Sequence, residues 1–531
     1  MDVEYSISML DFIKQQYLQR KNAAFLEFYG KKISFDDFFS YVDDCAENFA
    51  RFGVGKGDVV TLALPNCPQF VIAVYALSKV GAICSLLSPL SSKNSIEKTL
   101  TKTGSKIVII STLTPYDFDD VGAKTIRVHF NYFMPFIKKA VLEIKKHYSS
   151  GFAFENLLAK TYEPFVLKNI PDCNAPAFYL HSGGTTGEPK TVILSQKAVN
   201  YCALTITENI RDNGIKEGDD IVAAYILPLF YGYGLGVLHT QLYNGYSHVI
   251  RAKFKPEDLA KDFSKQNVNL MFGVPVMYAK MLKTGLWNSQ KVKNLRLCYI
   301  GGEKLSEELL GDFNKAFPNA SLVEGYGMTE AVTAFVACSK NNYKLNSCGK
   351  VGSFVKVEAF SENGELLSRG KEGELCVRSG ALMNGYLDGD NSVLFDFEGE
   401  KWLKTGDFGR VDEDGFIFLV QRIKNIIKRK GINIFPSQVE VCVSELPFVE
   451  KVKVFGYKDK TSIERIVCAV VLKDAPENAI NVIKEHVKEN ISILSTPEYV
   501  MIVDEFPMTN VGKVDAKKLL EKVDASAFDK L

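Results

Sequence analysis

The sequence predicts an α/β protein. It has a large N-terminal domain of parallel-type α/β sheets with a β-rich subdomain, and then a small, mobile α+β C-terminal domain. Three observations lead to this prediction. Short apolar runs alternate with helix-like segments through most of the chain, and strand–turn units follow from about residue 347. The length of 531 residues also exceeds what one hydrophobic core usually supports.

The first part of the chain alternates between strands and helices. "DVVTLALPN" (58–66) is a short apolar run ending in a Pro-Asn turn, which is typical of a buried strand, and "CPQFVIAVYALSKVGAIC" (67–84) has apolar residues at helical spacing. "SKIVIIST" (105–112) continues the alternation, which favours a parallel sheet. Several later candidate strands end at glycines or hydroxyls, where open α/β sheets place ligands: 176–182, 220–230, 270–275, 295–302 and 321–327.

The sequence pattern changes in the last third of the chain, from alternating strands and helices to short strand–turn units. The dipeptides Asn363-Gly364 and Asp414-Gly415 indicate antiparallel hairpins. A smaller strand-rich unit with flanking helices begins after "QRIKNIIKRKG". We therefore place a boundary near Gln421–Arg422, which gives an N-terminal domain at 1–421 and a C-terminal domain at 422–531.

Composition excludes several classes of protein. Lys+Arg 64 against Asp+Glu 63 leaves a formal charge of +1, without the basic excess of a nucleic-acid-binding protein. Eleven scattered cysteines without a C-x-x-C pair predict buried, reduced thiols. The N-terminus has no pattern of a signal peptide. Together these observations predict a cytoplasmic protein.

One segment has an amphipathic pattern of its own. "FMPFIKKAVLEIKKHY" (133–148) places apolar residues on one helical face and lysines on the flanks. We expect a surface helix docked on its own domain. The alternative is an interfacial helix that makes a peripheral contact with a membrane or an amphiphilic substrate.

A glycine- and hydroxyl-rich stretch, "HSGGTTGEPKTVILS" (181–195), is suited to phosphate binding but is not a P-loop. That pattern requires Gly-Lys-Ser/Thr after a glycine and four residues. Counting from Gly183 reaches Glu188, and counting from Gly184 reaches Pro189.

Three later motifs bear polar groups suited to nucleotide chemistry. "YGMTE" (326–330) offers a hydroxyl and a carboxylate, which are hard oxygen ligands for Mg²⁺. "KTGDFG" (404–409) presents Asp407, a carboxylate suited to ribose hydroxyls. "PMTNVGKVD" (507–515) presents Lys513 on a glycine-bearing loop. Taken alone, each is equally well explained as a strand end, a turn or a solvated loop.

Taken in order, the motifs resemble the adenylate-forming superfamily, which includes acyl-CoA synthetases, aryl-CoA ligases, luciferases and peptide-synthetase adenylation domains. The resemblance spans nearly the whole chain. It is carried by "KKISFDDFFSYV", "GVGKGDVVTLALPNCPQF", the 181–195 stretch, "LPLFYGYGLG", "YIGGEKL", "EGYGMTE", "SCGKVG", "GELCVRSGALMNGYL", "WLKTGDFGRVDEDGFIFLVQR", "KNIIKRKGINIFPSQVE" and "PMTNVGKVD".

The resemblance implies roles for specific residues, with ATP and coenzyme A as substrates and Mg²⁺ as cofactor. The flexible phosphate loop is matched by Ser182, Gly183, Gly184, Thr185, Thr186, Gly187 and Lys190. The adenine pocket is matched by Gly301, Gly302, Glu303 and Tyr326, the α-phosphate contact by Thr329, the Mg²⁺ ligand by Glu330, and the ribose contacts by Asp407 and Arg422. Lys513 matches the catalytic lysine, Lys424 the hinge, and the thiol-step loop is matched by Lys428, Gly431 and Asn433.

Three positions depart from the family pattern. Thr191 stands where the phosphate loop usually ends in glycine, and a second glycine precedes the threonines. Tyr231 stands where many members have a histidine that gates the carboxylate, and Asn433 stands where glutamine is frequent. Tyrosine does not titrate near pH 7, so any gate at this position works by ring rotation.

The resemblance also indicates the acid and the acceptor. An acid pocket is expected at Tyr231, Tyr233, Gly273, Val274, Gly301, Gly327 and Val332, an apolar and aromatic wall. Both fatty and aryl acids fit this wall, whereas α-amino acids are disfavoured because "LPLF" lacks a neighbouring aspartate. The sequence therefore predicts an ATP-dependent carboxylic acid–CoA ligase. The alternatives are a stand-alone adenylation enzyme that loads an acyl carrier protein and a nucleotide-binding regulatory protein without turnover.

Overall fold

The computed structural model describes residues 6–17, 24–136, 148, 151–160, 172–181, 190–287, 292–339, 343–389, 391–429, 432–458, 464–508 and 514–523. The chain packs into two compact units. The first unit comprises Met1–Val357, Val377–Leu403 and Gly415–Ile417, and the second comprises Glu358–Cys376, Lys404–Asp414 and Phe418–Leu531. The chain therefore passes between the units several times, and a boundary near Gln421–Arg422 stays a prediction.

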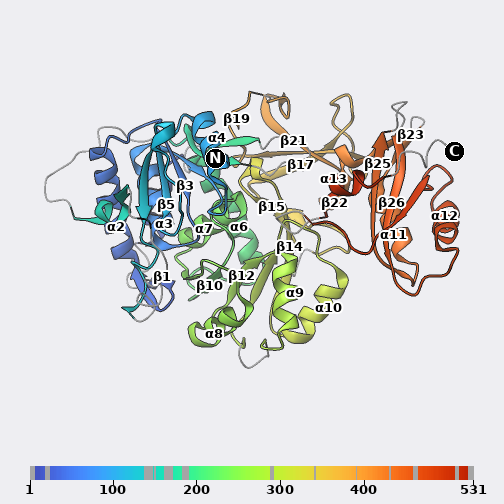
Figure 1. Cartoon of the computed structure of the whole chain (residues 1–531), viewed down its shortest axis with the longest axis horizontal. Coiled ribbons are helices and arrows are strands. Elements are labelled where there is room, and N and C mark those ends of the chain that lie inside the picture. The colour runs from blue at the N-terminus through green and yellow to red at the C-terminus, as the bar shows by residue number, and fades with distance from the viewer. Residues whose placement is uncertain are drawn as a thin grey trace. The chain divides into compact units, whose positions relative to one another are not determined.

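The first unit contains two large, mostly parallel sheets with helices packed on them (Figure 1). One sheet has the order β16-β15-β14-β13-β12-β10-β11-β1-β2. Its strands are β1 (Ala24–Phe28), β2 (Lys31–Ser34), β10 (Val222–Tyr225), β11 (Ser247–Ile250), β12 (Leu270–Gly273), β13 (Leu297–Ile300), β14 (Ser321–Gly327), β15 (Ala334–Ala337) and β16 (Lys350–Val351). All pairs from β1 through β11, β10, β12 and β13 to β14 are parallel.

The other sheet of this unit has the order β19-β9-β8-β4-β3-β5-β6-β7. Its strands are β3 (Val59–Ala63), β4 (Ile83–Leu86), β5 (Ile107–Ser111), β6 (Lys124–Val128), β7 (Phe152–Ala153), β8 (Pro176–His181), β9 (Thr191–Ser195) and β19 (Gly385–Tyr386). Parallel pairs run from β8 to β7, whereas β9 joins β8 and β19 antiparallel. These two sheets confirm the predicted α/β class.

Helix α3 (Pro68–Val80) shows how local sequence sets these elements. Pro68 occupies the first turn, where its missing N–H is not needed, and Gly81 ends the helix with φ 76°, a conformation that favours glycine. The helix therefore stops before the end of the predicted 67–84 segment, and β4 follows. The other helices of the unit are α1 (Met9–Tyr17), α2 (Phe35–Arg51), α4 (Lys93–Thr103), α6 (Gln196–Asp212), α7 (Gly232–Tyr243), α8 (Pro256–Gln266), α9 (Pro275–Lys283) and α10 (Glu307–Ala316).

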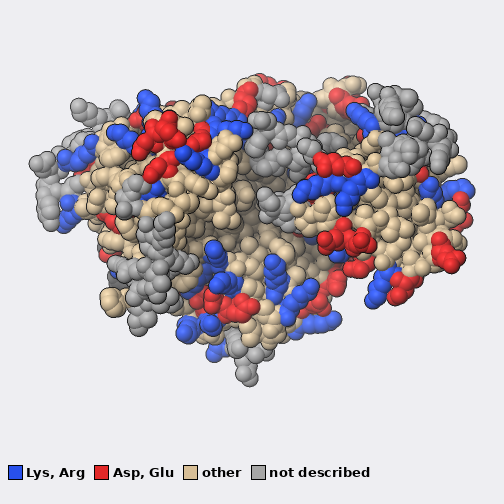
Figure 2. Space-filling view, viewed as in Figure 1, with Lys and Arg blue, Asp and Glu red and all other residues tan. Residues whose placement is uncertain are grey.

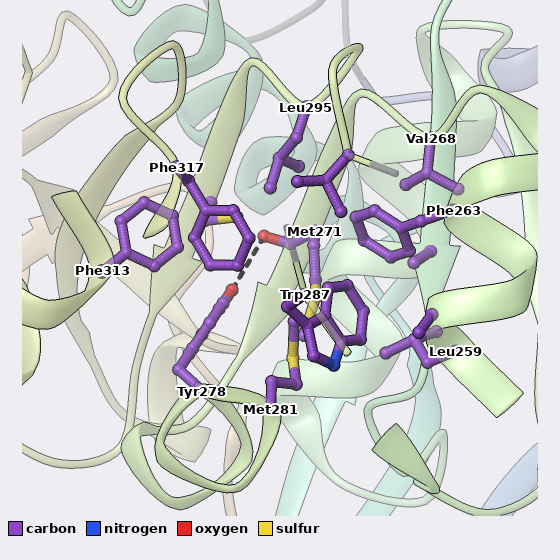
Figure 3. Packing of buried hydrophobic residues seen from close by; sticks show 14 of the residues in the cluster. Leu259, Phe263, Val268, Met271, Tyr278, Met281, Trp287, Leu295, Phe313 and Phe317 are labelled. Atoms are coloured by element: carbon purple, nitrogen blue, oxygen red, sulfur yellow. Dashed lines mark hydrogen bonds between the residues drawn. The ribbon is translucent and has the colours of Figure 1, made fainter. Parts of the chain in front are cut away.

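The core beneath α8, α9 and α10 is rich in aromatic residues and methionine (Figure 3). Trp287 packs edge-on against Phe263, with ring centroids 4.9 Å apart. The Tyr278 hydroxyl lies 3.2 Å from the Met271 carbonyl and 2.9 Å from the Tyr299 carbonyl, so the buried ring brings no unpaired polar atom into the core. This core fixes the strands β12 and β13 whose ends form the site.

The second unit is built on the sheet β25 (Val449–Lys458), β26 (Glu464–Leu472) and β27 (Tyr499–Ile502). Alternate residues of β26 enter two different hydrophobic clusters: Ile466 and Cys468 lie in one, and Val467 and Ala469 in the other. Both faces of this sheet are therefore covered. Among the residues described in this unit, the α-helices are α11 (Pro436–Ser444), α12 (Ala479–Asn490) and α13 (Ala516–Leu520).

A further sheet of the chain corresponds to the β-rich subdomain that the sequence predicted. This sheet has the order β17-β18-β21-β20, with β22 paired to β21. The strands are β17 (Val355–Phe360), β18 (Glu372–Ser379), β20 (Leu394–Phe397), β21 (Glu400–Val411) and β22 (Ile417–Arg422). The turn residues Gly364 and Gly415 have φ of 80° and 85°, which agrees with the expected hairpin turns.

The surface and the cysteines agree with the composition. Basic and acidic side chains are interspersed on the face drawn in Figure 2. All eleven cysteines are buried thiols. Within the described ranges, no helix is both long enough and apolar enough to cross a membrane.

Candidate active site

A cavity of about 550 Å³ lies in the first unit, between α6 and the ends of β12, β13, β14 and β15. One wall consists of aromatic rings. Phe272 and Tyr299 stack with centroids 4.5 Å apart and planes 4° apart, because they are direct partners in the parallel pair β12–β13. Tyr233 meets Phe272 edge-on at 6.5 Å. Two rings of this wall are therefore parallel and the third stands nearly perpendicular to them, at 80° to Phe272.

Two glycines keep the cavity open at the strand ends. A Cβ on Gly301 would lie 3.0 Å from the ring of Tyr233. A Cβ on Gly327 would lie 1.8 Å from the carbonyl oxygen of Thr333, so a side chain there displaces the backbone. Both glycines line the cavity, as the sequence led us to expect for an acid pocket.

Helix α6 gives the cavity a polar edge. The Tyr299 hydroxyl donates to Asn209 Oδ1 at 2.6 Å, and Asn209 Nδ2 donates to the Ala337 carbonyl at 3.3 Å. One residue earlier in α6, the Glu208 carboxylate accepts hydrogen bonds from the backbone N–H (2.8 Å) and hydroxyl (2.6 Å) of Ser353. These bonds pair the polar groups beside the rings. The carboxyl side chains of Glu208 and Asp212 both line the cavity, so this edge is acidic.

The turn after β14 carries a strained residue. Val332 has φ 66°, which is unfavourable for a β-branched side chain and costs on the order of 1–3 kcal/mol. Val332 is fully buried and lines the cavity. The Met328 N–H donates to the Thr333 carbonyl at 2.9 Å, which closes this turn. Such strain is retained where the geometry of a site depends on it.

Glu330 lies on the short helix η3 (Thr329–Ala331), directly after cavity-lining Thr329. Its Oε1 accepts a hydrogen bond from the Tyr386 hydroxyl at 2.7 Å, and its carbonyl accepts one from the Met383 N–H at 2.8 Å. Lys190 Nζ lies 4.5 Å from the centroid of the Tyr386 ring. A carboxylate oriented by a hydroxyl is a suitable oxygen ligand for Mg²⁺, so these residues fit the expected ion.

The second unit holds the two residues expected at the ribose. Asp407 is buried, and its Oδ1 lies 2.8 Å from Nε of half-exposed Arg422. Thr405 supports both partners, since its hydroxyl accepts from the Asp407 N–H (3.0 Å) and its carbonyl accepts from Arg422 Nη1 (3.2 Å). The pair is therefore prearranged within this unit.

Of the other described residues predicted for the adenine and acid pockets, one lines the cavity and the rest do not. Gly302 lines the cavity, and Tyr326 packs edge-on against Phe335 at 5.0 Å. Within the part of the chain that is described, the cavity wall does not include Glu303, Tyr326, Tyr231, Gly273 or Val274. Tyr231 is 41% exposed and its ring lies 4.5 Å from that of Phe230. Their contacts with substrates stay predictions.

Several predicted residues fall wholly or partly outside the described ranges. Ser182, Gly183, Gly184, Thr185, Thr186, Gly187, Gly431 and Lys513 lie outside them, as does most of the 133–148 segment. Lys424 belongs to the short helix η4 (Ile423–Asn425). Lys428 pairs with Asn433 in the antiparallel hairpin of β23 (Ile427–Arg429) and β24 (Ile432–Ile434). The hinge, thiol-step, phosphate-loop and membrane roles therefore stay predictions.

Sequence reasoning missed part of the site. Phe272, Tyr299 and Asn209 were not named, although Phe272 precedes Gly273 at the end of β12 and Tyr299 lies two residues before Gly301, which follows β13. Their register across β12 and β13 was the missing information. Tyr386 lies in the quoted motif "GALMNGYL", which gave no sign that its hydroxyl meets Glu330.

A different cluster has metal-ligating side chains. Ligand atoms of Cys442, Glu445 and His486 lie within 4.8 Å of one another in the second unit. His486 Nε2 lies 3.2 Å from Glu445 Oε2, and this contact accounts for the closeness of these two side chains without a metal ion.

Comparison with known families decides the class. The AMP-binding enzyme family matches residues 13–387, and the AMP-binding enzyme C-terminal domain matches residues 438–513. The chain belongs to the AMP-binding enzyme family. This membership confirms the resemblance drawn from the motifs and makes the protein an adenylate-forming acid–thiol ligase.

Relatives of this family member are similar over most of their length. A 4-coumarate–CoA ligase of Arabidopsis thaliana is 28% identical over 490 residues, which cover 90% of this chain and 85% of the relative. The anthranilate CoA ligase AuaEII, solved with anthranoyl-AMP, has a TM-score of 0.80 at 20% identity and covers 100% of this chain and 99% of its own. The o-succinylbenzoate CoA synthetase of Bacillus subtilis, solved with ATP and magnesium, has a TM-score of 0.77 at 23% identity, with 96% and 98% covered.

Proposed function

We propose that this protein is an aryl acid–CoA ligase. In the first step, an oxygen of the aromatic carboxylate attacks the α-phosphorus of ATP and the bond to pyrophosphate breaks. In the second step, the sulfur of coenzyme A attacks the acyl carbon, AMP leaves, and the thiol proton passes to solvent. The aromatic wall of Tyr233, Phe272 and Tyr299 is the observation that supports the choice of acid.

The wall favours an aromatic acid over a fatty acid for a physical reason. An aromatic guest gains from edge and face contacts with aromatic side chains, by about 0.5–1.5 kcal/mol beyond the area it buries. A flexible alkyl chain gains area but loses rotational freedom when it is confined. The named substrates of the relatives, 4-coumarate and anthranilate, are themselves aromatic acids. Aliphatic side chains such as Ile206, Val332 and Val336 also line the cavity, so fatty acids remain the alternative that the acid panel tests.

The nucleotide chemistry is assigned to polar residues. Gly302 and Thr329 line the cavity where adenine and the α-phosphate are expected, and Glu330 would hold Mg²⁺, which neutralises phosphate charge when bound. Ser182 to Lys190 would bind the leaving pyrophosphate, and Asp407 with Arg422 would bind the ribose. Lys513 would place positive charge between the carboxylate and the α-phosphate, where negative charge concentrates as they react.

The acceptor is coenzyme A in this proposal, and the small domain turns about Lys424 between the two steps. Lys428, Gly431 and Asn433 then serve the thiol step. A proline at position 424 restricts φ, so Lys424→Pro is expected to slow thioester formation and leave adenylation unchanged. An equal rate of thioester formation in the variant would refute the turn.

A panel of carboxylic acids tests the proposed function. Pyrophosphate release is measured with aryl, fatty and amino acids, and thioester formation is then measured with coenzyme A and with holo-carrier proteins. We expect release with aryl acids and transfer to coenzyme A. Release with fatty acids alone would refute the aryl assignment, and transfer only to a carrier protein would refute the acceptor.

A further inference from the structure

The two ends of the phosphate-loop segment meet at a strand pair. His181 is the last residue of β8 and Thr191 the first of β9, and they face each other in the antiparallel pair. The segment from Ser182 to Lys190 therefore leaves and re-enters the sheet at neighbouring positions. Thr191 stands where the family pattern has glycine, so its side chain is an addition of this chain.

The side chains at this strand pair form a linear hydrogen-bonded group. His181 Nδ1 lies 3.2 Å from the Thr191 hydroxyl, and His181 Nε2 lies 3.0 Å from the Ser85 hydroxyl on β4. Thr191 and Ser85 are fully buried. A neutral imidazole has one donor and one acceptor nitrogen, so one hydroxyl on each side satisfies it in either tautomer.

The environment keeps this imidazole neutral. Burial, together with the charge of Lys102, lowers the pKa of His181 to about 4, and the charge of Asp388 only partly opposes this. His181 therefore keeps an acceptor nitrogen at physiological pH. Its hydrogen bonds with Thr191 and Ser85 therefore do not change with pH near neutrality.

The backbone of Thr191 forms hydrogen bonds with the segment that contains Leu387 and Asp388. Its N–H donates to Asp388 Oδ2 at 3.3 Å, and its carbonyl accepts from the Leu387 N–H at 2.9 Å. Asp388 in turn pairs with Lys102 of α4 at 2.8 Å. Glycine at this position would keep both backbone contacts. The hydroxyl contact with His181 is what threonine adds.

We propose that Ser85, His181 and Thr191 form a clasp that positions the phosphate loop. The clasp holds His181 and Thr191, the residues on either side of the 182–190 segment, in register with each other, so that both attachment points of the segment are fixed before ATP binds. His181 and Thr191 are positioning residues, since they act through the loop. The clasp rests on the proposed function, because it assigns ATP phosphates to residues 182–190.

Paired substitutions test the clasp. Thr191→Val keeps the size of the side chain and removes its hydroxyl, and Thr191→Ser keeps the hydroxyl. Loss of one buried hydrogen bond predicts a rise of about tenfold in KM for ATP with Thr191→Val, measured by ATP–pyrophosphate exchange. KM for the acid is expected to stay within about twofold of the wild-type value, because neither His181 nor Thr191 lines the cavity. Thr191→Ser is expected to behave as wild type.

A matched control separates positioning from stability. Thr61 on neighbouring β3 is equally buried and donates to the Ser105 hydroxyl at 2.9 Å. Thr61→Val is expected to lower Tm as much as Thr191→Val but to leave KM for ATP unchanged. In the double variant with His181→Asn, Thr191→Val is expected to add little, since the two residues share one contact.

Thermal protection by MgATP distinguishes failure of the clasp from failure of the proposed function. If no acid supports exchange, yet ATP raises Tm of the wild type and less so that of Thr191→Val, the proposed reaction is wrong and the clasp holds. Unchanged protection in Thr191→Val would overturn the clasp. It would also be overturned if ATP gave no protection at all, or if KM for acid and ATP rose equally.

Discussion

The aromatic wall and the clasp lie in the same unit but are built from different interactions. The wall consists of stacked rings and glycines, with Phe272 and Tyr299 at 4.5 Å. The clasp consists of short polar contacts among Ser85, His181 and Thr191. In the proposed function, the wall contacts the acid, whereas the clasp serves the ATP step common to every acid. The proposal therefore predicts that selectivity and nucleotide chemistry are separable by mutation.

The largest effect is expected from a substitution that impairs adenylation, the step common to every acid. Lys513→Ala is expected to lower the rate of adenylation by about 10²–10³, the loss typical of one electrostatic contact to a developing charge. The loss should be the same for every accepted acid, because the lysine acts at the α-phosphate. Single-turnover formation of the adenylate measures it. Lys518→Ala, a lysine with an exposed side chain, is the control. Losses that differ widely between acids would contradict the separation.

The next largest effect is expected from a substitution that obstructs the aromatic wall. Gly301→Val places methyl groups within reach of the Tyr233 ring, since even a Cβ lies 3.0 Å from it. We expect KM for aryl acids to rise by about 10- to 100-fold and KM for ATP to rise much less, because the added Cβ meets the Tyr233 ring, although Gly301 also matches the adenine pocket. Steady-state kinetics with each substrate varied in turn measures this. Gly311 has no atom within 4 Å of its Cβ position, so Gly311→Val is the matched control. A parallel rise in both KM values would refute a wall specific for the acid.

A smaller effect concerns the orientation of Glu330. Tyr386→Phe removes the hydroxyl that donates to Glu330 Oε1 at 2.7 Å. Loss of such a supporting contact weakens metal binding by about 10- to 100-fold, so the Mg²⁺ concentration for half-maximal exchange should rise by that factor. Tyr17→Phe, which removes a comparable hydroxyl contact to Asp36, is the control. An unchanged Mg²⁺ requirement would show that the contact does not serve the ion.

The smallest expected effect is a dependence of stability on pH. Burial lowers the pKa of His239 to about 3 and, with Lys102, that of His181 to about 4. The unfolded chain takes up these protons near pH 6.5, so the free energy of unfolding falls as pH decreases from about 6.5 to 4. Urea unfolding at several pH values measures this slope. His181→Asn is expected to flatten it, and an unchanged slope would contradict a neutral, buried imidazole.

The sequence predicted the family and several residues that line the cavity, but not the two rings that stack in the aromatic wall. Motif order led to the family, and Gly301, Gly302, Gly327, Thr329 and Tyr233 line the cavity. Phe272 and Asn209 were missed because their contacts with Tyr299 depend on strand register and on the rotation of α6. Thr191 was recognised as unusual, but its partner was recognisable only once β8 and β9 were paired.

The most direct test of the central claim compares two acids with the same number of carbons. Cinnamic acid carries a phenyl ring, and nonanoic acid carries a linear chain. If the wall of Tyr233, Phe272 and Tyr299 selects aromatic acids, kcat/KM for coenzyme A thioester formation should be at least about tenfold higher for cinnamic acid. Equal values, or a preference for nonanoic acid, would contradict the account.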